Sequence, residues 1–238
     1  MPAELIVIDG PAGAGKSTVA RRVAEALGAS MLDTGAIYRS LAHVAQATGV
    51  AWTDEEGLAG LAARLQVEFV PAAQPGEPQR VLVRLEGVGE GEAEDLTTAI
   101  RTPAISEGAS KVSAHARVRA ALLGIQRAIA AVAIEAGRGC VAEGRDMGTV
   151  VFPEARHKFF LTASSAARAA RRHRELVARG RSISLEQVLA EMRTRDQRDS
   201  SREAAPLQQA ADATLVDSSE LDVEQVIARI LVEVGAPA

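Results

Sequence analysis

The segment Gly10-Pro11-Ala12-Gly13-Ala14-Gly15-Lys16-Ser17 constrains the fold more than any other part of the sequence. It lies between a short apolar run at residues 5–8 and a segment whose apolar residues recur at helical spacing. The pattern G-x-x-x-x-G-K-S between a strand and a helix is the phosphate-binding P-loop. Its glycines let backbone N–H groups surround phosphate oxygens at a helix N-terminus, which favours anions. The sequence therefore predicts a site for a nucleoside triphosphate.

Two polar residues at the end of this motif carry the expected chemistry. Lys16 is expected to reach the β- and γ-phosphates of ATP, and Ser17 to ligate the accompanying Mg²⁺ ion. The expected cofactor is thus Mg²⁺ bound with ATP, with Ser17 as its protein ligand. The predicted ATP-binding residues are Gly10, Pro11, Ala12, Gly13, Ala14, Gly15, Lys16, Ser17 and Thr18.

Other features narrow the class of nucleotide-binding protein. A GTPase would carry an N-K-x-D run that reads guanine, and the sequence has none. A motor ATPase would usually have an apolar strand ending in Asp-Glu, whereas the run at 140–142 continues into Glu143-Gly144-Arg145-Asp146. The size and texture of the chain therefore favour a small-molecule kinase.

Short apolar runs alternate with helical patterns along most of the chain. The runs lie at residues 5–8, 30–32, 140–142, 158–161 and 214–216, and long helices are expected at 118–132 and 164–179. Thr53 with Glu56, and Ser184 with Gln187, have the spacing of helix capping boxes. Continuous apolar runs are typical of parallel strands buried on both faces. The pattern predicts an α/β fold in which helices flank a parallel sheet.

Between residues 66 and 113 this alternation of apolar runs and helices is replaced by short strand-like segments. Residues 66–70 and 79–85 alternate as strands do, and a Pro/Gly stretch that includes Pro71, Pro75, Gly76 and Pro78 joins them. A Gly/Glu-rich turn at 87–94 leads to a third short run at 96–100. We therefore expect a small inserted antiparallel subdomain at 66–113, with the core formed by residues 1–65 and 114–238.

Charge and cysteine content limit the partners and the compartment. The 238-residue chain has 27 basic and 31 acidic residues, a net charge of −4, whereas proteins that coat nucleic acids are usually basic. Its one cysteine, Cys140, excludes an intramolecular disulfide and fits a reducing compartment. No apolar run is long enough to cross a bilayer, and no basic leader precedes the first strand. We expect a cytoplasmic monomer with neither a nucleic-acid polymer nor a membrane as partner.

Three further motifs carry a resemblance to a known family. They are Leu32-Asp33-Thr34-Gly35-Ala36-Ile37-Tyr38-Arg39, Gly144-Arg145-Asp146-Met147-Gly148-Thr149-Val150-Val151-Phe152-Pro153 and Arg195-Asp196-Gln197-Arg198-Asp199-Ser200-Ser201-Arg202. With the P-loop and Ile100-Arg101-Thr102-Pro103, they give a chain that resembles bacterial cytidylate kinases from residue 5 to its C-terminus, in the family's order. The resemblance implies a P-loop nucleoside monophosphate kinase fold with an enlarged monophosphate-binding insert and a short lid at about 168–184. It also implies transfer of the γ-phosphoryl group of ATP to CMP, and to dCMP as a second acceptor.

The resemblance assigns roles to individual residues. Thr34, Tyr38 and Arg39 match contacts to nucleotide phosphate, and Ser110, Arg119 and Asp146 match positions that read cytosine. Arg145 and Arg202 match arginines on the acceptor phosphate, and Arg195 and Asp199 match residues that hold the ribose. The implied catalytic residues are Lys16, Arg145, Arg195 and Arg202, and the implied lid residues are Arg168, Arg171 and Arg172.

The chemistry of these residue types agrees with those roles. The exocyclic amine of cytosine needs an acceptor, for which Asp146 and Ser110 are suitable, while its N3 and O2 atoms need a donor such as Arg119. Arg195, Asp199 and Arg202 would share one face if their segment is helical. The alternatives are a solvated lattice of ion pairs for this cluster and a solvated helix face for residues 168–174.

Two other functions stay open on the sequence alone. One is a different P-loop small-molecule kinase, of the uridylate or shikimate type, and the other is a non-catalytic nucleotide switch. The large insert and the cluster at 195–202 favour an acceptor site over a switch. The sequence departs from the family at Ala114-His115-Ala116, where proline is common, and in the Gly/Glu-rich turn at 87–95. These departures concern the loop shapes of the insert.

Overall fold

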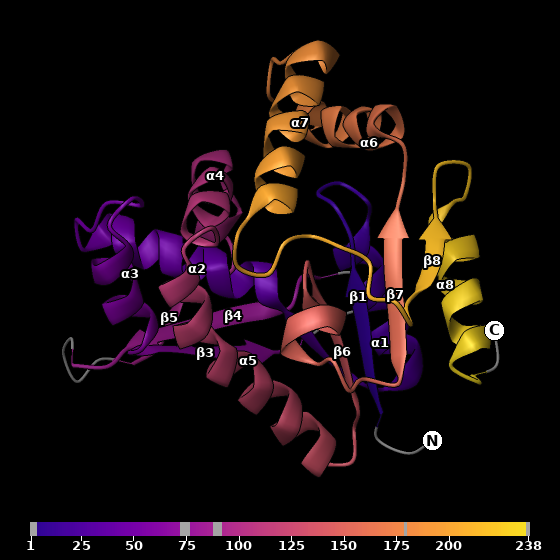
Figure 1. Cartoon of the computed structure of the whole chain (residues 1–238), viewed down its shortest axis with the longest axis horizontal. Coiled ribbons are helices and arrows are strands. Elements are labelled where there is room, and N and C mark those ends of the chain that lie inside the picture. The colour runs from indigo at the N-terminus through magenta and orange to yellow at the C-terminus, as the bar shows by residue number, and fades with distance from the viewer. Residues whose placement is uncertain (1–3, 72–76, 88–91, 179, 237–238) are drawn as a thin grey trace.

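A five-stranded parallel sheet forms the centre of the computed structural model, which describes residues 4–71, 77–87, 92–178 and 180–236 (Figure 1). Its strands run in the order β2-β6-β1-β7-β8. Their bounds are β1 Leu5–Asp9, β2 Ser30–Asp33, β6 Cys140–Gly144, β7 His157–Thr162 and β8 Thr214–Asp217. All four neighbouring pairs are parallel, so the five predicted strands and the α/β fold are confirmed.

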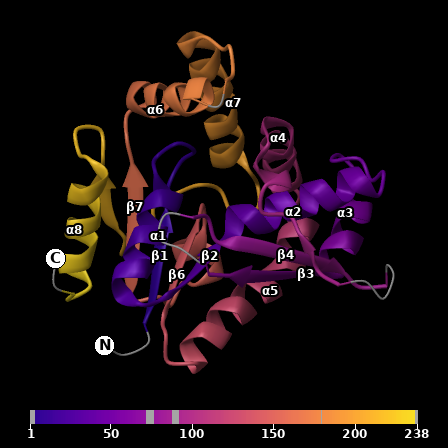
Figure 2. The same cartoon turned by 180° about the vertical axis from the view of Figure 1, so that it is seen from behind.

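Helices cover both faces of this sheet (Figures 1 and 2). Because side chains alternate along a strand, Ile6 and Ile8 pack in a core with α1 and α8, whereas Val7 packs in a core with α2 and α5. The helices are α1 Lys16–Leu27, α2 Thr34–Ala47, α3 Glu55–Ala62, α4 Pro103–Val112, α5 Ala116–Glu135, α6 Ser165–Ala178, α7 Leu185–Ser201 and α8 Val223–Glu233. The pair α6 and α7 lies above the carboxyl ends of the strands in Figure 1. No helix within the described residues is long and apolar enough to cross a membrane.

A second, antiparallel sheet contains β3 Leu65–Val70, β4 Arg80–Leu85 and β5 Glu94–Asp95. The apolar side chains on one face of β3 and β4 join the same core as α2 and α5. The third run, at 96–100, follows β5 directly, and Leu96 N continues the pairing with β4 by donating to Val81 O at 2.9 Å. Its buried residues Leu96 and Ile100 are four positions apart and belong to a helical turn that ends in the 3₁₀ helix η1 Ala99–Arg101. The division of the chain at 66–113 stays a prediction.

One predicted helix cap is confirmed and the other is wrong. Ser184 and Gln187 form the capping box of α7. The cap of α3 is Asp54 rather than Thr53, because the Asp54 carboxylate accepts a hydrogen bond from Gly57 N at 3.0 Å. Parts of some predicted segments lie outside the described residues, namely residues 1–3 at the N-terminus, Pro75 and Gly76, residues 88–91 of the Gly/Glu-rich turn, and Arg179.

Asp9, the last residue of β1, joins the P-loop strand to the segment after β6. Its Oδ1 accepts a hydrogen bond from Met147 N at 2.9 Å, and its Oδ2 accepts one from Gly148 N at 2.8 Å. These two N–H groups open the π-helical turn η2 Met147–Val151, which directly follows Asp146. The Asp9 side chain is buried, and this burial raises its pKa to about 6. Asp9 therefore fixes the position of Arg145 and Asp146 relative to the P-loop.

We predict that Asp9 makes the protein lose stability as the pH rises from about 4 to about 6. The folded-state pKa lies above the ordinary value of 3.8, so folding favours the protonated carboxyl, and that contribution is lost as the pH rises through the folded pKa. Relative to an Asp9→Asn variant, the free energy of unfolding of the wild type should fall by at most about 3 kcal/mol over this range. Urea denaturation across the range measures the difference. Parallel curves for the two proteins would contradict the assignment.

Candidate active site

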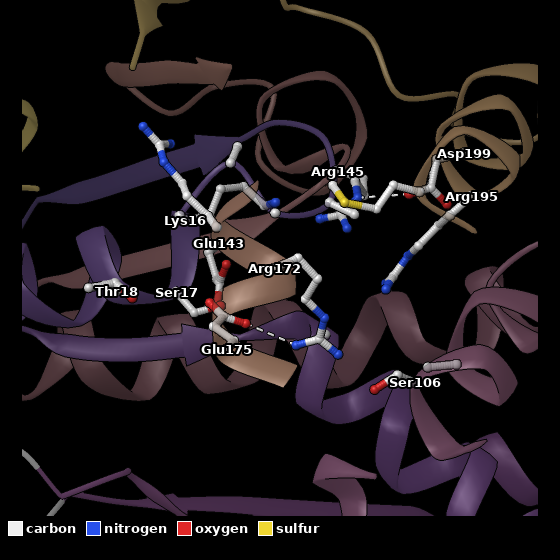
Figure 3. Close-up of a pocket in the computed structure, with 18 of the residues that line it drawn as sticks. Lys16, Ser17, Thr18, Ser106, Glu143, Arg145, Arg172, Glu175, Arg195 and Asp199 are labelled. Carbon is white, nitrogen blue, oxygen red and sulfur yellow. Dashed lines mark hydrogen bonds and ion pairs between the residues drawn. The ribbon is translucent and has the colours of Figure 1, made fainter. Parts of the chain in front are cut away.

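A cavity of about 1290 Å³ opens at the carboxyl edge of the parallel sheet. Its walls come from the P-loop, the start of α2, α4, the segment after β6, the helices α6 and α7, and residues 218–223 after β8. Figure 3 shows side chains from the start of α1, from α4, from the end of β6 and the segment after it, and from α6 and α7 around one space. The volume exceeds the roughly 300–1,000 Å³ of a usual small-molecule pocket, so more than one ligand fits.

The P-loop has the backbone geometry of an anion cradle. Gly10 has φ 149°, and a Cβ at this position would lie 1.9 Å from Leu161 O of the neighbouring strand, so only glycine fits. Gly15 caps α1 with φ 95° and no side-chain cap, which leaves the first N–H groups of the helix without a side-chain acceptor. Uncapped N–H groups at a helix N-terminus favour a bound anion.

Lys16 is buried beneath this loop, and its Nζ donates a hydrogen bond to Pro11 O at 2.8 Å. Burial, helped by the positive charge of Arg145, lowers the pKa of Lys16 to about 7. A phosphate next to Nζ would compensate for both effects, since it brings negative charge to a buried cation.

Glu143, which no sequence motif had marked as a site residue, lies beside Lys16 and Ser17 (Figure 3). It stands near the end of β6, in register with Ile8 of the P-loop strand. The side chain is 4% exposed, and its Oε1 has no hydrogen-bond partner within the described part of the chain. Burial and the neighbouring charge of Asp33 raise its pKa to about 6. An acidic residue at the carboxyl end of a strand adjacent to the P-loop strand was the signal that could have identified it.

The side chains of Glu143 and Ser17 both carry oxygen atoms that fit a Mg²⁺ ion arriving with a nucleotide. Mg²⁺ prefers oxygen ligands and is usually held by one or two protein groups together with phosphates and water. The Glu143 carboxylate offers an oxygen without a partner, and Ser17 offers a hydroxyl at the first turn of α1. Among the described residues no cluster of three or more His, Cys, Asp or Glu could hold a metal by itself.

Arg119 on α5 and Asp146 after β6 form a buried ion pair. Their side chains are 9% and 4% exposed, and the Arg119 guanidinium lies 5.5 Å from the ring centroid of Tyr38 on α2. Arg119 also donates to Ser113 O at 3.3 Å. The structure thus brings together three of the predicted CMP-binding residues from three distant parts of the chain.

Arg145, Asp199 and Arg202 form a second, largely buried group, of which Figure 3 shows Arg145 and Asp199. Arg145 Nε lies 2.9 Å from Asp199 Oδ2, and Arg202 Nε donates to Asp199 O at 3.2 Å. The predicted helical segment is α7, and Arg202 forms its C-cap. Arg202 Nη2 and Arg195 Nε have no hydrogen-bond partner among the described residues. Burial and the charge of Arg145 lower the pKa of Arg195 to about 10. Uncompensated guanidinium groups of this kind favour a bound anion.

Thr34 and Arg39 of α2 also line the cavity. The Thr34 hydroxyl donates to Glu143 O at 2.7 Å, and Arg39 Nη2 lies 2.8 Å from Asp33 Oδ2. Asp33 also caps α2 by accepting from Ala36 N at 2.8 Å. Ser110, on α4, is buried and does not line the cavity directly, and its hydroxyl accepts a hydrogen bond from Arg198.

The arginines of α6 have separate partners. Arg168 is buried, donates to Ala12 O of the P-loop at 2.9 Å and pairs with Asp196 on α7 at 2.7 Å. A solvated helix face is therefore the wrong interpretation for Arg168. Arg171 donates to the Ser218 hydroxyl at 3.0 Å, and Arg172 pairs with Glu175 at 3.0 Å within the cavity. No local sequence pattern indicated that residues 218–223 would face this site.

Comparisons with known proteins agree with this arrangement. The family described as cytidylate kinase matches residues 6–236. The cytidylate kinase of Pseudomonas entomophila (strain L48) is 48% identical over 233 residues, which cover 98% of this chain and 96% of that protein. The cytidylate kinase of Pseudomonas syringae pv. tomato is 49% identical with the same coverage. Among solved structures, a sugar kinase from Janibacter sp. HTCC2649 covers 100% of both chains at 16% identity with a TM-score of 0.44, a likeness too low to support an inference. The family match spans the P-loop and every cavity residue named above, and the chain belongs to the cytidylate kinase family of phosphotransferases.

Proposed function

We propose that this enzyme transfers the γ-phosphoryl group of ATP directly to the 5′-phosphate of CMP, and that dCMP is a second acceptor. The observation that supports this most is the cluster of arginines in the same cavity as the P-loop, some of whose N–H groups have no partner in the described part of the chain. A nucleotide switch needs no second anion site beside its triphosphate, whereas a kinase for a phosphorylated acceptor does.

On the donor side, the P-loop N–H groups and Lys16 hold the phosphates of ATP. Ser17 and Glu143 hold Mg²⁺, which when bound neutralises the developing charge on the phosphate oxygens. Arg168 on α6 donates to Ala12 O of the P-loop and pairs with Asp196 on α7. These two contacts attach the lid segment to the P-loop. Closure of the lid and of the insert would exclude water and limit the waste of ATP by hydrolysis.

On the acceptor side, Arg145 and Arg202 hold the CMP phosphate, Arg195 and Asp199 hold the ribose, and Asp199 also orients Arg145. The acceptor phosphate is already anionic near neutral pH, so the reaction needs no general base. Catalysis then consists of in-line positioning and stabilisation of charge by groups that are in place before the substrate arrives. No covalent intermediate is required.

At the base-reading end, Arg119 and Asp146 line the cavity, and Ser110 lies buried on α4 with its hydroxyl bound to Arg198. Asp146 accepts from the exocyclic amine of cytosine, and Arg119 donates to its N3 and O2 atoms. Uracil reverses the hydrogen-bonding polarity at positions 3 and 4, so buried groups would be left unpaired at a cost of about 1–3 kcal/mol. Three further predictions rest on the sequence. They are the ribose contacts of Arg195 and Asp199, the phosphate contacts of Thr34, Tyr38 and Arg39, and the cytoplasmic monomer.

A coupled assay of ADP production tests this function directly. With ATP–Mg²⁺ we expect turnover that depends on the acceptor, with CMP and dCMP used far better than UMP, and none with shikimate. Slow hydrolysis that is independent of any acceptor would overturn the kinase in favour of a switch. Turnover of UMP equal to that of CMP would overturn the assignment of cytosine.

We predict that Lys16→Met lowers kcat by about a hundredfold or more, because it removes a preorganised donor from the transferred group. The KM for CMP should change little, since Lys16 serves the donor nucleotide. Arg21→Met, at a partly exposed position on the same helix and outside the cavity lining, is the matched control and should retain wild-type kinetics. Full activity in the Lys16 variant would remove this residue from the mechanism.

We predict that Arg119→Met raises the KM for CMP and lowers the preference for CMP over UMP by about ten- to hundredfold. The substitution removes the donor to cytosine and leaves Asp146 unpaired. Steady-state kinetics with both nucleotides give the ratio, and circular dichroism confirms that the variant folds. A folded variant whose CMP:UMP ratio equals that of the wild type would show that Arg119 does not read the base.

A further inference from the structure

Arg198 connects two walls of the cavity, one formed by α7 and the other by α4. It lies on α7 between Arg195 and Arg202, and its side chain lines the cavity with 27% of its surface exposed. Its partners are on α4, which is remote from α7 in sequence. The two walls that it joins are those proposed to hold the phosphate and the base of CMP.

Two contacts attach Arg198 to α4. Its Nη1 donates to Ser110 Oγ at 2.7 Å, and its Nη2 lies 3.3 Å from Glu107 Oε1. Glu107 also lies 3.7 Å from Lys111 Nζ. The guanidinium of Arg198 thus binds the side chains of Glu107 and Ser110, which are three positions apart on one face of α4. A second arginine of this region, Arg202, reaches Ser113 O after α4 at a longer distance of 3.5 Å.

The direction of the Ser110 hydrogen bond follows from chemistry. A guanidinium group can only donate, so the Ser110 oxygen must accept from Arg198. One lone pair of the hydroxyl is then occupied, and a second lone pair stays available to accept from another donor. A hydroxyl held in this way has lost most of its rotational freedom before the substrate arrives, which lowers the entropy cost of binding.

We propose that Arg198 is a positioning residue for CMP: by holding Ser110 and Glu107 it fixes the base-reading wall on α4 relative to the phosphate-reading wall on α7. This inference rests on the proposed function, because it assumes that these two walls bind the same nucleotide. Arg198 acts through Ser110 and makes no contact with the transferred phosphoryl group. Its loss should therefore weaken CMP binding and leave the chemical step intact.

The first experiment measures steady-state kinetics of Arg198→Gln, with Arg193→Gln at an exposed position of the same helix as control. We expect the KM for CMP to rise about five- to tenfold while kcat stays within about twofold of wild type, because uniform binding is lost. Arg198→Lys keeps the charge and reaches only one of the two partners, so it should restore part of the affinity. A lower KM would mean that Arg198 competes with CMP for Ser110, and a loss of kcat at unchanged KM would mean that it acts on the phosphoryl group. Either result would overturn the proposal.

A double-mutant cycle separates action through Ser110 from a general structural effect. Ser110→Ala and the double variant are measured with the same substrates, and calorimetry gives the Kd for CMP of all four proteins. Action through Ser110 predicts that Arg198→Gln has little further effect once the hydroxyl is absent. Additive effects would refute the inference.

If the wild type does not use CMP, the proposed function fails, whereas normal use of CMP with an unchanged KM in Arg198→Gln refutes only the role of Arg198.

Discussion

The ion pairs Arg119–Asp146 and Arg145–Asp199 hold together the parts of the chain that meet beside the P-loop. The first joins α5 to the segment after β6, and the second joins that segment to α7. All four side chains are largely buried, so removal of one partner would leave a buried charge unpaired at a cost of about 3–5 kcal/mol. Asp9 adds a neighbouring constraint, because its two hydrogen bonds fix the turn that follows Asp146. The groups that build this site therefore also fix the positions of the elements around it.

Pairing in this region is incomplete: among the described residues, Arg195 Nε and Arg202 Nη2 have no hydrogen-bond partner, and neither does Glu143 Oε1. The N–H groups of Arg195 and Arg202 that lack partners, together with Lys16 under the P-loop, leave positive charge in a cavity that reaches both proposed nucleotide sites. A net charge of −4 over the whole chain conceals this local excess. The preference for arginine over lysine between residues 168 and 202 is consistent with it, because a planar guanidinium can serve a carboxylate, a backbone carbonyl and a phosphate together. Binding of two phosphorylated substrates would balance the charge.

Much of the fold could be predicted because local patterns determine it. Continuous apolar runs identified all five parallel strands, and the P-loop spacing identified the first strand-to-helix connection. The short apolar run at 96–100 did not distinguish a strand from a helix, because Leu96 and Ile100 are four positions apart and also fit a single helical turn. Glu143 lacked a role because its significance depends on which strand lies next to β1. The hydrogen bond from Arg198 to Ser110 joins residues that are 88 positions apart, and no local pattern reveals such a contact.

The central claim is that one preformed charge network receives both the base and the phosphate of CMP. A crystal structure of the enzyme with CMP bound tests it most directly. We expect cytosine within hydrogen-bond distance of Arg119 and Asp146, and the 5′-phosphate within hydrogen-bond distance of Arg145 and Arg202. A nucleotide bound with its phosphate away from these arginines, or with its base outside the Arg119–Asp146 pair, would contradict the account.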